Sequence, residues 1–172
     1  MDTHSLFSLT GRTALVTGGS RGIGKMIATG FIAQGAKVYI SSRKADVCEA
    51  VAAELGPNCI AVPEDISTVE GCKALAATMA DKEDAIDILV NNAGMNWDGV
   101  IWKMTEENWD EVIDVNLKGC FNYSRAAAQV FRESGGGKIV IIASINGLRG
   151  KFGQTNYSAS KGGEIGLAKT LA

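Results

Sequence analysis

Tyr157 and Lys161 are the two residues whose types and spacing most directly suggest chemistry. They are four positions apart in a segment with a helical pattern, so both side chains project from one face of a helix. A phenol can exchange a proton with a carbonyl oxygen, but its ordinary pKa of about 10 is too high for this near pH 7. A neighbouring ammonium group lowers that pKa by stabilising the phenolate. The pair therefore predicts proton transfer at a substrate oxygen, with an ordinary surface contact as the alternative.

A glycine-rich turn between a predicted strand and a predicted helix is the second chemical feature. It spans Thr17–Gly24 (TGGSRGIG). Backbone N–H groups at the start of a helix bind a pyrophosphate well, and glycines let the phosphates approach the main chain. The spacing is Gly-x3-Gly-x-Gly, which differs from the general GxGxxG pattern. We predict a dinucleotide site here, with a tight turn that binds nothing as the alternative.

The end of the second predicted strand indicates which dinucleotide is bound. NAD sites usually carry an Asp or Glu there, which holds the ribose 2′-hydroxyl. This sequence instead has Ser41–Lys44 (SSRK). Arg43 would attract a 2′-phosphate, and Arg21 of the glycine turn could reach the same phosphate. We predict NADP(H) rather than NAD(H); the alternative is that Arg43 is a solvated residue at a helix start.

The elements that must position these groups alternate along the chain. Strands are predicted at 12–17, 37–42, 58–63, 86–90 and 138–143, and helices at 22–34, 44–55, 68–82, 106–132 and 156–172. Val/Ile-rich strands separated by helices imply a parallel sheet that is covered on both faces. Right-handed crossovers then give an α/β, doubly wound, Rossmann-like fold. We expect residues 1–172 to form a single dinucleotide-binding domain.

The C-terminal end of the chain departs from this fold. A dinucleotide-binding sheet of this kind has six or more strands, whereas five are found. The apolar pattern continues to Ala172 without a Gly or Pro that would end the helix. We therefore expect a domain that lacks its last strands, with the fifth strand left as an edge.

Six motifs in order resemble one family, the short-chain dehydrogenases/reductases, from about Leu9 to Ala172. The glycine turn is the first of them. The others are Asp65-Ile66 after the third strand, Asn91-Asn92-Ala93-Gly94 after the fourth, Asn116 within Asp114–Gly119, Ser144 after the fifth, and Tyr157-Ser158-Ala159-Ser160-Lys161. The resemblance implies an oxidoreductase that transfers a hydride between NADP(H) and a carbonyl or secondary alcohol.

The resemblance also implies roles for the residues that follow the third and fourth strands. Asp65 would bind the adenine amino group, and Ile66 would flank the ring. Asn91, Ala93 and Gly94 would line the adenosine-ribose side and steady the central strand. Each residue taken singly has an alternative role: Asp65 as the N-cap of a helix, and Asn91 as a turn residue. The complete expected cofactor set is Gly18, Ser20, Arg21, Gly22, Ile23, Gly24, Ser42, Arg43, Asp65, Ile66, Asn91, Ala93, Gly94, Tyr157 and Lys161.

The same resemblance implies four catalytic residues, Asn116, Ser144, Tyr157 and Lys161. Tyr157 would act as acid and base, and Lys161 would also bind the nicotinamide ribose hydroxyls. Ser144 would hydrogen-bond the substrate oxygen and stabilise its developing negative charge. Asn116 would hold a water that links Lys161 to solvent. Taken alone, a serine after a strand is more often a turn or cap residue.

The substrate is suggested by the stretch Ser144–Tyr157, which looks like that of 3-oxoacyl-[acyl-carrier-protein] and acetoacetyl-CoA reductases. A 3-oxoacyl thioester is therefore the expected substrate. Sugar and polyol dehydrogenases of the same family share much of this stretch and are the first alternative. Two alternatives from other classes are a catalytically inactive nucleotide-binding fragment and an interaction module. The interaction module would use the long helices, which correspond to the dimer interface of the family. A homodimer or homotetramer is expected of the complete protein.

Composition excludes several other classes. A net charge of −2 gives no electrostatic footprint for nucleic acid. No apolar run approaches the ~18 residues of a membrane span, and the chain is expected to be cytoplasmic. The cysteines, four in all, form no CxxC pair and are expected to be buried free thiols. His4 is the only histidine, which nearly excludes a histidine base, and no metal site is expected.

Overall fold

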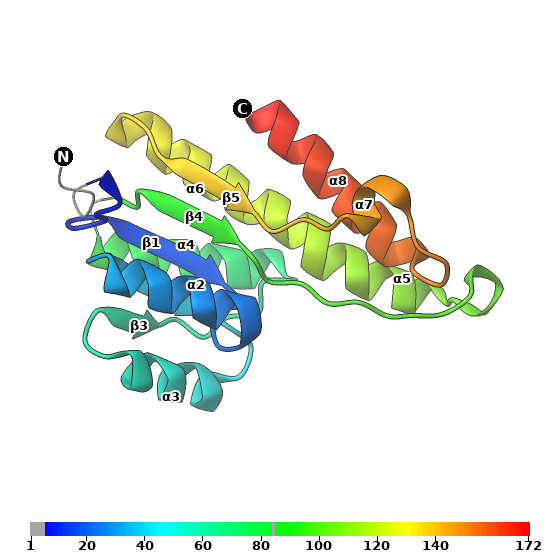
Figure 1. The fold of residues 1–172 in the computed structure, drawn as a ribbon, viewed down its shortest axis with the longest axis horizontal. Coiled ribbons are helices and arrows are strands. Elements are labelled where there is room, and N and C mark those ends of the chain that lie inside the picture. The colour runs from blue at the N-terminus through cyan, green and yellow to red at the C-terminus, as the bar shows by residue number, and fades with distance from the viewer. Residues whose placement is uncertain (1–5, 84) are drawn as a thin grey trace.

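The computed structural model describes residues 6–83 and 85–172, and its strands form one parallel sheet in the order β3-β2-β1-β4-β5 (Figure 1). His4 lies outside the described residues. The strands are β1 (Thr13–Thr17), β2 (Lys37–Ser41), β3 (Cys59–Ala61), β4 (Ile88–Asn91) and β5 (Lys138–Ile141). All pairs of neighbouring strands are parallel. The predicted strands are confirmed to within two residues at each end.

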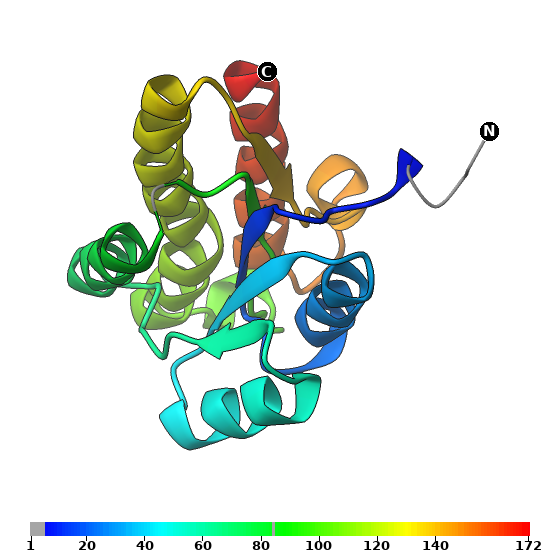
Figure 2. The same cartoon turned by 90° about the vertical axis from the view of Figure 1, so that its left-hand side faces the viewer.

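Helices cover both faces of this sheet, as the continuous apolar strands predict. On one face lie α2 (Gly22–Ala33) and α3 (Ala45–Leu55), and on the other lie α4 (Val69–Lys82) and α6 (Gly119–Ser134) (Figure 2). Side chains alternate between the two faces along each strand. Ala14 and Val16 of β1 therefore pack in the core beneath α2 and α3, whereas Leu15 packs in the core beneath α4 and α6.

The doubly wound topology sets where a ligand site can form. From β1 the chain moves to β2 and β3 on one side, and then crosses to β4 on the other side of β1. The loops after β1 and β4 therefore diverge at the carboxyl edge of the sheet, and open α/β folds bind ligands at such a point. β5 is an edge strand, as predicted, and its Val140 is 42% exposed.

The long helix predicted over 106–132 is present, but it contains a π-helical turn that the sequence did not predict. The structure has α5 (Glu106–Ile113), a π-helical turn η2 (Asp114–Lys118) and then α6. No Pro or Gly lies within η2, so the sequence carries no local signal for the interruption. Its physical cause is tertiary, because the Asn116 side chain is hydrogen-bonded to the main chain of Met95. A π-turn inside a helix is frequently found at a functional site.

Three further elements complete the chain. η1 (Ile101–Lys103) and α7 (Asn146–Arg149) were not expected from the sequence, whereas α8 (Thr155–Leu171) confirms the last predicted helix. No helix among the described residues is long and apolar enough to cross a membrane.

The cysteines are buried and free, as expected. Burial raises the pKa of each thiol, to about 11 for Cys59 and Cys120.

Candidate functional site

The glycine turn between β1 and α2 is tightly packed against the loop that follows β4. A Cβ atom added at Gly18 would lie 2.9 Å from the Cα atom of Ala93, and one at Gly24 would lie 2.3 Å from the carbonyl oxygen of Gly18. Gly22 has open space around it, but its φ of 52° is in the left-handed region that favours glycine. Two of these glycines are therefore required by packing and one by backbone conformation.

Two polar residues to which sequence reasoning assigned no role tie the diverging loops together. The hydroxyl oxygen of Thr17 accepts hydrogen bonds from the backbone N–H groups of Asn92 and Ala93, at 3.0 and 3.1 Å. The Nδ2 atom of Asn92 donates to the carbonyl oxygen of Thr17 at 2.9 Å. The sequence did contain a signal for this contact. A polar residue follows or ends each of two predicted parallel strands, and the carboxyl ends of parallel strands meet at one edge of the sheet.

A cavity of about 580 Å³ runs along this edge of the sheet. The start of α2 lines it, and no side chain of the described residues caps that helix, which leaves backbone N–H donors for an anion. Most of the expected cofactor residues line the cavity: Gly18, Ser20, Arg21, Gly22, Ile23, Gly24, Ser42, Arg43, Asp65, Ile66, Ala93 and Gly94.

The charged residues of the cavity lie on different elements. Arg21 and Arg43 are exposed side chains, one at the start of α2 and one after β2. Glu64 and Asp65 belong to the segment between β3 and α4. The Oδ1 atom of Asp65 accepts hydrogen bonds from the N–H and hydroxyl of Ser67, at 2.9 and 2.8 Å. Asp65 thus shapes the turn before α4, although the N-cap of that helix is Thr68.

Asn91 is not among the residues that line the cavity. It is buried, and its Nδ2 atom donates to the Ser124 hydroxyl of α6 at 3.0 Å. Its carbonyl oxygen accepts a hydrogen bond from the N–H of Ile142 at 2.9 Å. The structure therefore gives Asn91 contacts that hold β4 against α6 and the end of β5, and none with the cavity.

Tyr157 and Lys161 lie on one face of α8, as their spacing predicts. The Lys161 ammonium nitrogen is 5.9 Å from the centre of the Tyr157 ring. Lys161 is buried, and Tyr157 is half-buried. The Nζ atom donates to the carbonyl oxygen of Ile142, which follows β5, at 2.8 Å. This bond fixes the lysine at the carboxyl edge of the sheet.

Gly94 lines the cavity and lies close to the Lys161 ammonium. A Cβ atom at Gly94 would lie 3.3 Å from the Oδ1 atom of Asn116 and 3.6 Å from the Nζ atom of Lys161. Asn116 is held by the main chain of Met95, whose N–H donates at 2.8 Å and whose carbonyl oxygen accepts at 2.9 Å. Its Nδ2 atom also donates to the Ser160 hydroxyl at 3.0 Å. Asn116 and Lys161 thereby both lie close to Gly94, whereas the four expected catalytic residues themselves do not line the cavity.

Ser144 lies half-buried between β5 and α7. Its hydroxyl oxygen accepts a hydrogen bond from the N–H of Asn146 at 3.2 Å, so it has the local capping role that a lone serine suggests. α7 packs closely on α8, because a Cβ atom at Gly147 would lie 2.6 Å from the carbonyl carbon of Lys161. The segment that carries Ser144 is therefore held against the helical turn that carries Lys161.

Glu164 is a residue that the sequence-based site does not contain. Both of its carboxylate oxygens accept hydrogen bonds from the Lys161 ammonium group at 2.9 Å. Burial raises the pKa of Glu164, and the charge and hydrogen bonds of Lys161 oppose that rise. The sequence indicates this ion pair only through the (i, i+3) spacing of two opposite charges on one helix. The sequence alone does not tell that this pair is buried.

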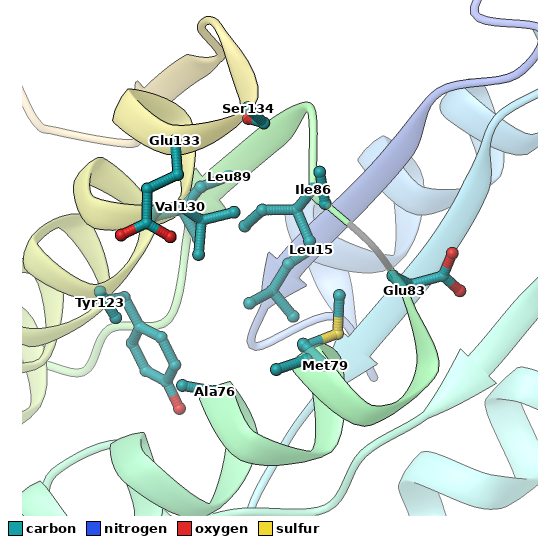
Figure 3. Close-up of a pocket in the computed structure, with 14 residues that line it drawn as sticks. Leu15, Ala76, Met79, Glu83, Ile86, Leu89, Tyr123, Val130, Glu133 and Ser134 are labelled. Atoms are coloured by element: carbon teal, nitrogen blue, oxygen red, sulfur yellow. The ribbon is translucent and has the colours of Figure 1, made fainter.

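A second cavity of about 460 Å³ lies between α4 and α6, against β1 and β4 (Figure 3). Its walls are largely apolar, with Leu15, Leu89 and Val130 among them. None of the residues expected to bind cofactor or act in catalysis lines it.

Comparison with known proteins agrees with the fold and with this arrangement. A family model for short chain dehydrogenases matches residues 12–172. The chain is 41% identical over 169 residues to the 3-oxoacyl-[acyl-carrier-protein] reductase of Synechocystis sp., covering 96% of this chain and 68% of that protein. It is 44% identical over 163 residues to the acetoacetyl-CoA reductase of Shinella zoogloeoides, covering 94% of this chain and 66% of that protein.

A solved structure, the Pseudomonas aeruginosa RhlG/NADP active-site complex, matches with a TM-score of 0.91 and 36% identity, over 96% of this chain and 68% of that one. The family match extends over nearly the whole sequence and is joined by close agreement in fold. The chain therefore belongs to the short-chain dehydrogenase family.

Proposed function

We propose that this protein binds NADP(H) and catalyses hydride transfer between it and a carbonyl compound, with a 3-oxoacyl thioester as substrate. The observation that carries the proposal is the junction at Gly94. Gly94 lines the cavity that begins at the helix start of α2, and it lies close to a lysine that is beside a tyrosine. Membership of an oxidoreductase family and a relative solved with NADP support the same function.

The cavity fits a nicotinamide dinucleotide in shape and chemistry. The start of α2 offers backbone donors for a pyrophosphate, where the packing around Gly18 and Gly24 leaves no room for a side chain. Arg21 and Arg43 supply positive charge for a 2′-phosphate. The Ser41 hydroxyl lines the same cavity, is buried and has no partner among the described residues, so it offers a polar contact to a ligand.

The side chains of the protein would donate the proton and bind the substrate oxygen. The bound dinucleotide would supply the hydride. Tyr157 would donate its proton to the substrate oxygen, and the Lys161 ammonium would stabilise the phenolate that remains. The Ser144 hydroxyl accepts a hydrogen bond within its own turn, which leaves its hydrogen for donation to the substrate oxygen. Asn116 would anchor a water beside Lys161 that exchanges protons with solvent.

The substrate class follows from similarity to reductases of 3-oxoacyl and acetoacetyl thioesters. The test is NADPH oxidation measured with acetoacetyl-CoA, a longer 3-oxoacyl thioester and a panel of ketoses. We expect kcat/KM to be highest for the thioesters. Higher kcat/KM for sugars would favour the polyol dehydrogenase alternative, and NADPH binding without any turnover would favour a catalytically inactive nucleotide-binding protein.

Arg43→Ala is expected to weaken NADPH binding about tenfold, equal to about 1.4 kcal/mol, because a charged hydrogen bond to the 2′-phosphate is lost. NADH binding should change little. Dissociation constants from fluorescence titration measure both. Arg132→Ala is the matched control, since it removes an exposed charge in the last turn of α6 outside the cavity. Equal affinity of the parent protein for NADPH and NADH would refute the predicted cofactor preference.

Gly24→Ala is expected to reduce the affinity for NADPH by about tenfold or more. The added methyl group would lie 2.3 Å from the carbonyl oxygen of Gly18, so the glycine turn must move away from the phosphate position. Calorimetric titration checks this. Gly30→Ala is the control, because it adds the same methyl group in open space on the same helix. Unchanged NADPH affinity in Gly24→Ala would remove the glycine turn from the site.

Two further expectations stay predictions. The first is a homodimer or homotetramer whose interface includes α6 and α8, and analytical ultracentrifugation tests it. The second is a cytoplasmic location.

A further inference from the structure

We propose that Glu164 is a positioning residue for the Tyr157–Lys161 pair. Its buried carboxylate holds the Lys161 ammonium and reduces the positive charge that reaches the Tyr157 phenol. The catalytic meaning of this effect rests on the proposed function, but the electrostatic effect itself does not. Glu164 thereby sets the pH range over which Tyr157 gives and takes a proton.

The contacts of Lys161 give Glu164 this influence. The ammonium nitrogen lies 2.9 Å from each carboxylate oxygen of Glu164, and 2.8 Å from the carbonyl oxygen of Ile142. A lysine ammonium has three hydrogens; the two oxygens of one carboxylate share one of them and the Ile142 carbonyl takes another, so Glu164 and Ile142 together hold the ammonium in place. The Lys161 and Glu164 side chains are only 5% and 3% exposed, so water screens this ion pair weakly.

The neighbouring elements add little charge to this pair. From α6, the Cys120 thiol faces it; burial and then the charge of Glu164 raise the pKa of that thiol to about 11, so it is neutral near pH 7. Asp114 and Lys118 of η2 form their own ion pair, with side chains 40% and 50% exposed. The other charged side chains of the packed elements are at exposed positions: Glu106, Glu107, Asp110 and Glu111 of α5, Arg125, Arg132 and Glu133 of α6, Lys138 of β5 and Arg149 of α7.

The electrostatic consequence has a definite sign. The Lys161 ammonium beside the Tyr157 ring favours the phenolate, whereas a carboxylate on the same ammonium favours the neutral phenol. With Glu164 ionised, the ion pair has no net charge, and much of the effect of the lysine on the phenol is cancelled. While Lys161 stays protonated, removing the charge of Glu164 therefore leaves more positive charge beside the Tyr157 ring, which favours its phenolate.

Glu164→Gln is the direct test, because the amide keeps the shape and one acceptor while it removes the charge. The readout is the NMR titration of ¹³Cζ-labelled tyrosine in the cofactor-free chain, with the Tyr157 signal assigned from Tyr157→Phe. We expect the titration midpoint of Tyr157 to move down by about one pH unit, a size set by Coulomb interaction over several ångströms at an intermediate dielectric. Asp114→Asn is the matched control, and it should move the midpoint far less. An unchanged or raised midpoint in Glu164→Gln would overturn the proposal.

A second variant keeps the proposal testable if Glu164→Gln does not fold. Glu164→Asp retains the charge but withdraws the carboxylate by one carbon from the Lys161 ammonium. The Tyr157 midpoint should then move in the same direction by a smaller amount; a shift to higher pH, or none, would contradict the proposal.

Because the titration needs neither cofactor nor turnover, it separates this inference from the reductase activity. If activity is present, the alkaline limb of the pH–rate profile for carbonyl reduction should move with the midpoint in Glu164→Gln, because Tyr157 must be protonated to act as the acid. A midpoint shift in a chain without reductase activity would refute only the proposed function.

Discussion

Tyr157→Phe is expected to lower kcat for carbonyl reduction by about 10² to 10⁴-fold, the usual contribution of a general acid. The substitution removes only a hydroxyl, and that hydroxyl has no hydrogen-bond partner among the described residues. The fold should therefore be unchanged. Tyr157 also belongs to the expected cofactor set, so the affinity for NADPH should fall, but by far less than kcat. Steady-state rates with a 3-oxoacyl thioester, together with NADPH titration, check both parts.

Tyr123→Phe is the matched control for this variant. Tyr123 lies on α6 in the core against α4, and its hydroxyl is buried without a partner in the described part of the chain (Figure 3). Removing an unsatisfied buried hydroxyl costs little stability, so this variant should retain the parent rate. A Tyr157→Phe protein that keeps most of its reductase rate would exclude Tyr157 as the proton donor.

Lys161→Met is expected to lower the free energy of unfolding by about 3–5 kcal/mol, because it leaves the Glu164 carboxylate buried without its counter-charge. It should also abolish most of the reductase activity, since the phenolate loses its stabilising charge. Urea unfolding measures the first effect and steady-state rates the second. The loss of stability should be smaller at pH 5 than at pH 8. An unpaired buried carboxyl has a raised pKa in the folded state, so it is protonated at pH 5 and penalises folding only at higher pH.

The double variant Lys161→Met with Glu164→Leu separates stability from chemistry. Replacing a buried ion pair with apolar residues of similar volume is often neutral for stability, so most of the lost unfolding free energy should return. The reductase rate should not return, because the ammonium group is still absent. A double variant as unstable as Lys161→Met would mean that the ion pair is not the source of the loss. A double variant with the parent rate would remove Lys161 from the mechanism.

The apolar character of the short strands made the sheet predictable from the sequence. Residues 13–17 are apolar or small in an unbroken run, which requires cover on both faces of the sheet. The clusters around Ala14 and Leu15 confirm this requirement. The glycine turn was equally predictable, since its position between a strand and a helix is a property of the local chain. The facing of Tyr157 and Lys161 follows from helical geometry alone.

Other features depend on contacts between distant segments. The π-turn at 114–118 exists where the Asn116 side chain bonds the main chain of Met95, and no residue within the turn signals it. Asn91 and Asn92 are adjacent and chemically identical, but the alternation of a strand end sends only Asn92 to the cavity. The exact roles expected of the cofactor residues stay predictions until ligand binding is measured.

The parallel sheet, the order of its helices and the chemical groups at its carboxyl edge could all be predicted from the amino-acid sequence. Those properties follow from local periodicity and from backbone conformations that few residue types can adopt. Which of these groups share a buried environment depends instead on how distant segments pack together. The pairing of Lys161 with Glu164 and Ile142 is the clearest case, because burial depends on how α8 packs against β5 and α7, and spacing along one helix does not contain that information.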